Sequence, residues 1–162
     1  MTARIVVLEL SRIEAAHLAR LVVQFGELLQ DSIGDDGDPA IARLVPAAYD
    51  DEEAAREFRR LTEADLLDRR RDDADRVLAS LGDSVTLPED LDDPALLEQV
   101  QIRLDQLTAR AWLRTLAAIR LVLASRLGIE VAEDHDPDDP RFAIYDWLGY
   151  RLDGLVAAVD VD

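Results

Sequence analysis

Three aspartates near the C-terminus have a spacing that could hold a metal ion. Asp134, Asp136 and Asp138 form the D-x-D-x-D opening of a calcium-binding loop. Such a loop needs a glycine at its sixth position and a bidentate glutamate at its twelfth, and those positions hold Asp139 and Tyr145. Because two key positions differ, we expect a solvated acidic loop in which Asp139 caps the next helix. Loose cation binding by these many carboxylates is the alternative.

The chain has few residues of the types that usually perform catalysis. It contains no cysteine, which excludes a thiolate nucleophile, a zinc–thiolate site and a thiol redox switch within this sequence. His17 and His135 are the only histidines, and His17 has no partner histidine four residues further on. No serine lies in a nucleophile elbow, and no glycine-rich loop could cradle a phosphate. We therefore expect a protein that is not an enzyme and that carries no cofactor.

The charge of the chain restricts its partners. Acidic residues outnumber basic ones by 35 to 18, every basic residue is an arginine, and the formal net charge is −17. Nucleic-acid affinity needs clustered positive charge, so we expect no direct contact with nucleic acid. The only basic run, Arg69 to Arg71, is flanked by aspartates and is expected to form a salt-bridged helix face. An acidic surface instead speeds association with basic protein surfaces.

Two arginines interrupt an apolar stretch. Arg120 and Arg126 lie within residues 116–127, which are otherwise mostly apolar. A charge in such a stretch must be paired or must reach the surface. We expect carboxylates of neighbouring helices to pair with these arginines, so that the arginines form structural salt bridges between helices. The alternative is that one or two of them form a cleft for an acidic partner or an anion.

The elements that position these residues are mainly helices. Residues 4–10 are rich in β-branched side chains and predict a strand. Ser11 and Glu14 then match a capping box, and apolar residues at helical spacing extend the first helix to about Ser32. Residues 84–87 predict a second short strand that could pair with the first. Asp50 is expected to open another long helix.

A repeated dipeptide marks further helix starts. Asp-Pro occurs at residues 38–39, 93–94 and 139–140, an N-cap aspartate followed each time by a proline suited to the first helical position. The helix after residue 93 is expected to run to about Arg126, where Gly128 follows. The fold class predicted is mainly α: one domain over residues 1–162, a bundle of about four long helices with a small two-stranded β element.

Three segments resemble an actinobacterial family of unknown function. They span residues 38–60, 112–129 and 145–159. In the first segment the matching residues include Arg43, Tyr49 and Arg59, and in the second they include Arg120 and Arg126. Some members of the family are named as the AosR type of oxidative-stress transcriptional regulator. The resemblance covers nearly the whole chain, and we take these five residues as contacts to a partner or as structural ties.

The resemblance implies a mainly helical cytoplasmic protein with a regulatory role through protein partners such as a sigma factor. Members are often encoded beside the adaptor of the Clp protease. The resemblance supplies no catalytic residue. Redox-responsive members are thought to sense through cysteines, and this chain has none. A thiol switch must therefore be absent or lie on a partner.

We therefore expect a non-enzymatic regulatory protein that acts through protein–protein contacts, on a sigma factor or on RNA polymerase. One alternative is an accessory protein linked to the Clp protease, and another is a metal-binding or enzymatic domain that uses the acidic loop. No apolar run reaches the roughly 18 residues that cross a membrane, so we expect a cytoplasmic location. The long helix also leaves apolar surface that a homodimer would cover.

Overall fold

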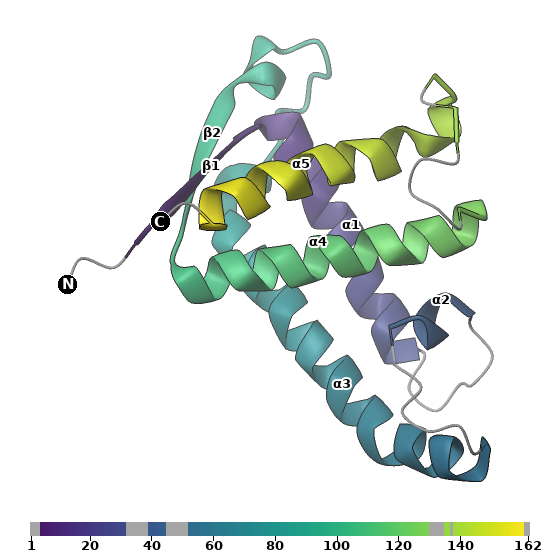
Figure 1. Ribbon diagram of the computed structural model, residues 1–162. Coiled ribbons are helices and arrows are strands. Elements are labelled where there is room, and N and C mark those ends of the chain that lie inside the picture. Colours follow the sequence, from purple (N-terminus) through teal and green to yellow (C-terminus); the bar gives the residue numbers. More distant parts are fainter. Residues whose placement is uncertain (1–3, 32–38, 45–51, 130–134, 137, 161–162) are drawn as a thin grey trace.

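In the part of the chain that the structure describes, the fold consists of four long α-helices, one short α-helix and two strands (Figure 1). The computed structural model describes residues 4–31, 39–44, 52–129, 135–136 and 138–160. The elements in chain order are β1 (Val6–Ser11), α1 (Arg12–Asp31), α2 (Pro39–Ala42), α3 (Glu52–Leu81), β2 (Gln99–Leu104), α4 (Gln106–Leu127) and α5 (Ala143–Asp160). The prediction of a mainly α fold with about four long helices and a small two-stranded β element is confirmed.

The position of the second strand was predicted wrongly. Residues 84–87 overlap a short 3-10 helix, Gly82–Val85, and β1 pairs instead with Gln99–Leu104 in antiparallel register, Val6 opposite Leu104. Sequence analysis had placed that segment inside the longest helix. In β2, buried Ile102 and Leu104 alternate with exposed residues, which is the two-residue period of a strand. Val100 and Leu104 also fit helical spacing, so periodicity alone could not separate the two structures.

The helix starts follow the predicted caps in part. The hydroxyl of Ser11 accepts a hydrogen bond from the backbone N–H of Glu14 at 3.2 Å, as the capping box requires. The second Asp-Pro pair opens only a 3-10 turn, Pro94–Leu97, and α4 begins after Asp105, whose side chain caps it. The third pair opens the 3-10 turn Pro140–Phe142, which leads directly into α5. Asp50, the expected start of the next long helix, lies outside the described residues.

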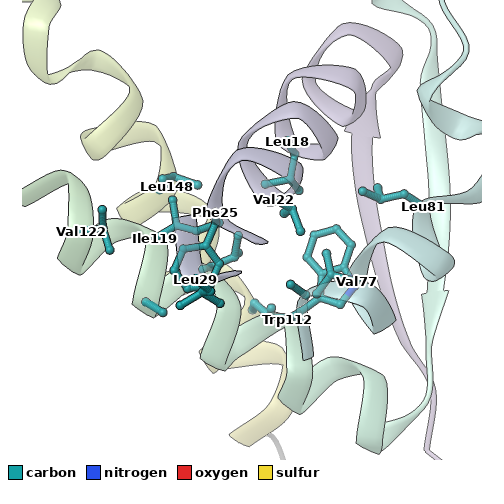
Figure 2. Packing of buried hydrophobic residues seen from close by; sticks show 14 of the residues in the cluster. Leu18, Val22, Phe25, Leu29, Val77, Leu81, Trp112, Ile119, Val122 and Leu148 are labelled. Carbon is teal, nitrogen blue, oxygen red and sulfur yellow. The ribbon is translucent and has the colours of Figure 1, made fainter. Parts of the chain in front are cut away.

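The core lies where α1, α3, α4 and α5 meet (Figure 2). Trp112 of α4 is fully buried, and its ring lies beside Val77 of α3. Leu18 and Val22 approach from α1, and Leu148 from α5. Each of these helices buries one face in the core and exposes another to solvent, as amphipathic helices do. Burial of these side chains fixes how α4 and α5 lie beside one another in Figure 1.

A hydrogen bond joins α3 to the buried tryptophan. The Nε1–H of Trp112 donates to the Oγ of Ser80 at 2.8 Å, and that hydroxyl donates to the carbonyl of Val77 at 2.6 Å. A buried indole N–H needs such a partner, because leaving it without one costs the whole desolvation penalty. Ser80 therefore fixes the tryptophan ring against α3.

We predict that Ser80→Ala lowers the free energy of unfolding by about 1–3 kcal/mol, because the indole N–H stays buried without an acceptor. Urea denaturation of the single variants and of a double variant with Trp112→Phe measures this. The Ser80→Ala change should cost less in the Trp112→Phe background, where no N–H remains. Equal costs in the two backgrounds would contradict the coupling.

We also predict a pH-dependent contribution from Asp105, the N-cap of α4. Its carboxylate accepts a hydrogen bond from the backbone N–H of Thr108 at 2.8 Å, and this bond lowers the pKa of Asp105. A group whose folded pKa is lowered stabilises the fold above its unfolded pKa, about 3.9, and loses that contribution as the pH falls through the folded value. Wild type should thus unfold at a higher temperature than Asp105→Asn at pH 6, with the gap closing towards pH 3.

The comparison separates charge from hydrogen bonding. Asparagine keeps an acceptor for the N–H of Thr108, whereas Asp105→Ala removes it and should lower the melting temperature across the whole pH range. A gap between wild type and Asp105→Asn that does not change with pH would contradict the prediction.

Candidate functional site

Arg120 lies in the second half of α4 and is held by neutral groups of α5. Its guanidinium lies over the ring of Tyr145, 4.1 Å from the ring centroid, and its Nε–H donates to the carbonyl of Tyr145 at 3.3 Å. Gly149, one helical turn further along α5, makes this approach feasible. A Cβ atom at Gly149 would lie 2.8 Å from an Nη atom of Arg120. The side chain of Arg120 is half-buried in this position.

The expectation that a carboxylate would pair with Arg120 is therefore not met within the part of the chain that the structure describes. The partners are an aromatic face and a backbone carbonyl, both electrically neutral as groups. An aromatic ring attracts a cation through its quadrupole, and a carbonyl accepts a hydrogen bond. These contacts orient the guanidinium without neutralising its charge. Sequence could not show this, because 25 residues separate Arg120 from Tyr145.

Arg43 faces the same groove as Arg120. Ala40, Ile41 and Leu44 are buried and hold α2 and the turn after it against the core, while Arg43 is exposed between them. The two arginines and Tyr145 line a groove of about 290 Å³. Its other lining residues are apolar: Ala117, Leu121, Ala124, Ile129 and Leu152. We call this the arginine groove.

No other predicted site residue is among the described residues that line the arginine groove. Tyr49 lies outside the described residues, and of Arg59 only the backbone is described, within α3. Arg126 lies in the last turn of α4 with its side chain exposed, and its expected pairing with a carboxylate of a neighbouring helix stays a prediction. A cation there complements the negative end of the helix dipole. Of the five predicted site residues, the structure brings Arg43 and Arg120 together in one groove.

The basic run on α3 belongs to a salt-bridged face in part. Arg69 pairs with Asp65 one turn earlier at 3.0 Å, as its spacing predicts. Arg70 donates to the carbonyl of Arg114 at 3.5 Å, and Arg114 pairs with Asp73 at 2.8 Å. The contacts of Arg70 and Arg114 connect α3 to α4, and within the run Arg69 is the arginine for which the described residues provide a carboxylate.

A second groove, between α1 and α5, was not found by sequence analysis. It encloses about 500 Å³, and Leu21, Ile144 and Trp147 give it an apolar centre. Ile144 is 51% exposed. Polar residues border this centre: Glu14, His17, Arg20 and Gln24. Sequence analysis favoured the core for Trp147 and kept an interface role as the alternative, and the side chain is in fact half-buried beside this groove. We call it the α1–α5 groove.

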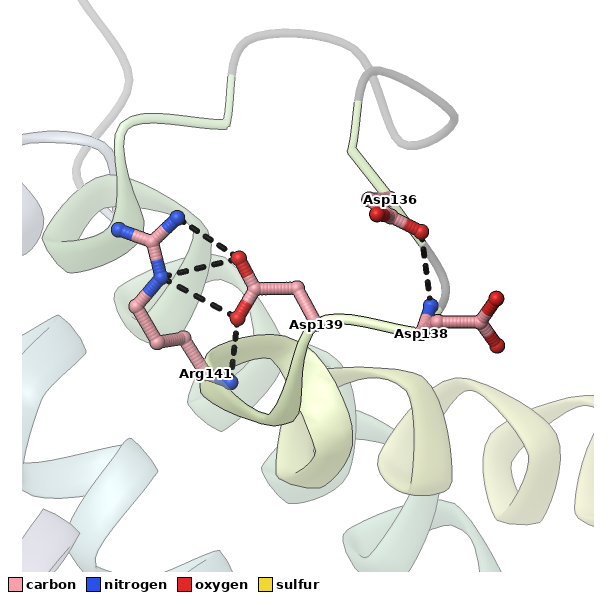
Figure 3. A network of polar contacts seen from close by, with 4 residues as sticks. All are labelled: Asp136, Asp138, Asp139 and Arg141. Carbon is pink, nitrogen blue, oxygen red and sulfur yellow. Dashed lines mark hydrogen bonds and ion pairs between the residues drawn. The ribbon is translucent and has the colours of Figure 1, made fainter.

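Contacts within the chain occupy the carboxylates of Asp136 and Asp139 in the acidic loop (Figure 3). The carboxylate of Asp136 accepts from the backbone N–H of Asp138 at 2.9 Å, and Asp138 points its own carboxylate away from the other two. Asp139 caps the turn that precedes α5 and pairs with Arg141 at 2.7 Å. Hydrogen bonds from Arg141 lower the pKa of Asp139. The expected helix-capping role of Asp139 is confirmed, and Asp134 lies outside the described residues.

The same loop is attached to α5 through a histidine. Nε2 of His135 lies 2.7 Å from a carboxylate oxygen of Asp146. The imidazole also lies against the rings of Phe142 and Tyr145, with centroids 4.7 and 5.6 Å away. His135 is thus a structural contact, and across the described ranges no group of three or more histidine or acidic side chains is arranged to hold a metal ion.

Comparison with known proteins places the chain in a family. The model of a family described as a domain of unknown function, DUF2017, matches residues 1–159, and the chain belongs to that family. No curated protein matches the chain. No solved structure matches it. Among the described helices, none is both long and apolar enough to cross a membrane.

We predict that two glycine substitutions in α5 differ in effect. A Cβ at Gly154 meets nothing within 4 Å, so Gly154→Ala should raise the free energy of unfolding by about 0.5–1 kcal/mol through helix propensity. Gly149→Ala must displace the guanidinium of Arg120, which loses its contacts with Tyr145 at a cost of roughly 1 kcal/mol. Chemical denaturation should therefore show little or no gain for Gly149→Ala.

An equal gain for both variants would contradict this account, because it would mean that the position of Arg120 contributes nothing to stability. A crystal structure of Gly149→Ala provides the direct control, in which the guanidinium should no longer lie over the ring of Tyr145.

Proposed function

We propose that this chain is a non-enzymatic regulatory protein that acts by binding another protein, and that its partner is a sigma factor or RNA polymerase. The α1–α5 groove is the observation that carries the proposal. Its apolar centre and polar border match the anatomy of a protein interface, in which a desolvated core is surrounded by polar residues. Half-buried Trp147 is the type of residue that anchors such interfaces.

The shape of the groove favours a helix as the docking segment. Two helices form its walls, α1 through Leu21 and α5 through Ile144 and Trp147. Amphipathic helices bind in grooves of this kind by inserting apolar side chains spaced by three or four residues. We therefore infer that the partner presents a helix with apolar anchors.

Charge selects the kind of partner that would carry this helix. With a net charge of −17, the chain attracts basic surfaces over a distance and repels nucleic acid. Proteins of the transcription machinery offer basic surfaces because they bind DNA. The chain would then alter promoter use in the cytoplasm without touching DNA, which fits the regulatory role through protein partners that its resemblance to the AosR type of actinobacterial regulator implies. Membership of that type is part of this proposal.

Neither alternative function gains a specific supporting observation. The carboxylate of Asp136 bonds to the backbone of its own loop and Asp139 is paired with Arg141, so neither supports a metal-based activity. An accessory role beside the Clp protease would use the same type of interface, so only the identity of the partner separates it from our proposal. A homodimer would also bury exposed apolar surface, and it could therefore compete with the partner protein for the α1–α5 groove.

We predict that the tagged protein, used as bait at low salt, enriches RNA polymerase or a sigma factor from its host lysate, and that purified polymerase holoenzyme binds it directly. Ile144→Glu should weaken direct binding at least about tenfold, because it places a charge in the apolar centre of the groove. Biolayer interferometry with purified components measures this.

Leu107→Gln is the matched control. Leu107 is an apolar residue of α4 that is 64% exposed and does not line the α1–α5 groove, so its variant should bind as the wild type does. Enrichment of protease components would favour the accessory role and overturn the proposal. So would an Ile144→Glu variant that is folded and binds polymerase with unchanged affinity.

A further inference from the structure

Carboxylates pair with many arginines of this chain, but not with the two arginines of the arginine groove. Among the described residues, arginines in ion pairs with acidic side chains lie outside that groove and include Arg12, Arg69, Arg114, Arg141 and Arg151. Arg43 and Arg120 have no acidic partner among the described residues. Arg4 and Arg70 also bond to backbone carbonyls rather than to carboxylates, so the feature that sets Arg43 and Arg120 apart is that they share one groove with apolar side chains.

The guanidinium groups of Arg43 and Arg120 can bind an anion from outside the chain. Stacking on Tyr145 and one hydrogen bond from Nε fix the plane of Arg120 and leave its Nη donors available. No hydrogen bond or ion pair joins the guanidinium of Arg43 to a described residue. None of the described residues that line the groove is acidic. A half-buried cation that only neutral groups contact gains from binding an anion.

We propose that the arginine groove binds a small organic anion, with an apolar body and a carboxylate or phosphate head. The guanidinium forks of Arg43 and Arg120 match the geometry of either head group. The apolar residues between them, among them Leu121, Ala124 and Ile129, would contact the body of the ligand. A volume of about 290 Å³ suits a small molecule.

The net charge favours a small ligand over an acidic macromolecule. An acidic peptide or a nucleic acid brings many negative charges towards a protein of charge −17 and is repelled at each of them. A small anion brings only one or two, which ordinary salt screens. The arginine groove lies on a different face of α5 from Ile144 and Trp147, so this site does not depend on the proposed protein interface.

Isothermal titration calorimetry of the full chain tests the proposal with four probes: benzoate, phenyl phosphate, neutral benzamide and inorganic phosphate. We expect benzoate or phenyl phosphate to bind with a Kd of about 1 mM or tighter, and about tenfold more tightly than benzamide or inorganic phosphate. Which of the two binds better identifies the head group. Failure of both to bind, or equally tight binding of inorganic phosphate, would overturn the proposal.

Variants locate the site. Arg43→Gln and Arg120→Gln should each weaken binding of the better probe at least about tenfold, since each removes one charged fork. Arg110→Gln removes the same charge from an exposed position of α4 outside the groove and should leave the affinity unchanged. Gly149→Ala keeps every charge but displaces Arg120, and a folded variant with weakened binding shows that position matters as well as charge. Unchanged affinity in Arg43→Gln and Arg120→Gln would overturn the assignment.

Discussion

Burial of α4 on several sides at once is the constraint on which the rest of the structure depends. This helix contacts α2, α3 and α5 as well as β2, and Trp112, Leu116 and Ile119 are almost fully buried. The exposed surface in the first two thirds of α4 is a single stripe through Leu107, Arg110, Arg114 and Ala117. Alanines such as Ala111 and Ala118 let neighbouring helices approach closely, so the packing of α4 decides where α3 and α5 lie.

The two grooves are consequences of that packing. Because α5 lies along α4, one of its faces borders the α1–α5 groove with Ile144 and Trp147, while another faces α4 and presents Tyr145. Tyr145 then provides the ring on which Arg120 stacks, and Gly149 leaves the space for it. Helix α5 therefore contributes to both grooves. The α1–α5 groove is apolar and suits a protein partner, whereas the arginine groove is cationic and suits an anion.

Sequence analysis identified the fold class but misplaced one of its strands. Local caps were reliable where a side chain bonds to its own neighbours, as Ser11 does at α1 and Asp139 before α5. The segment from Gln99 to Leu104 was misassigned, because apolar residues two and four apart satisfy strand and helix spacing alike. Pairing with β1 decides between them, and the paired residues lie 88 to 98 positions apart in the chain.

The sequence by itself determined the charge, the lack of thiol chemistry and the mainly helical class, and it indicated which arginines are candidate contacts. Composition and local hydrogen bonding are sufficient for these properties. Only the tertiary structure decided that Arg43 and Arg120 share a groove, that Tyr145 rather than a carboxylate holds Arg120, and that Trp147 borders a surface. The physical reason is that side-chain contacts between elements depend on helix packing, which brings together residues whose separation along the chain carries no local pattern.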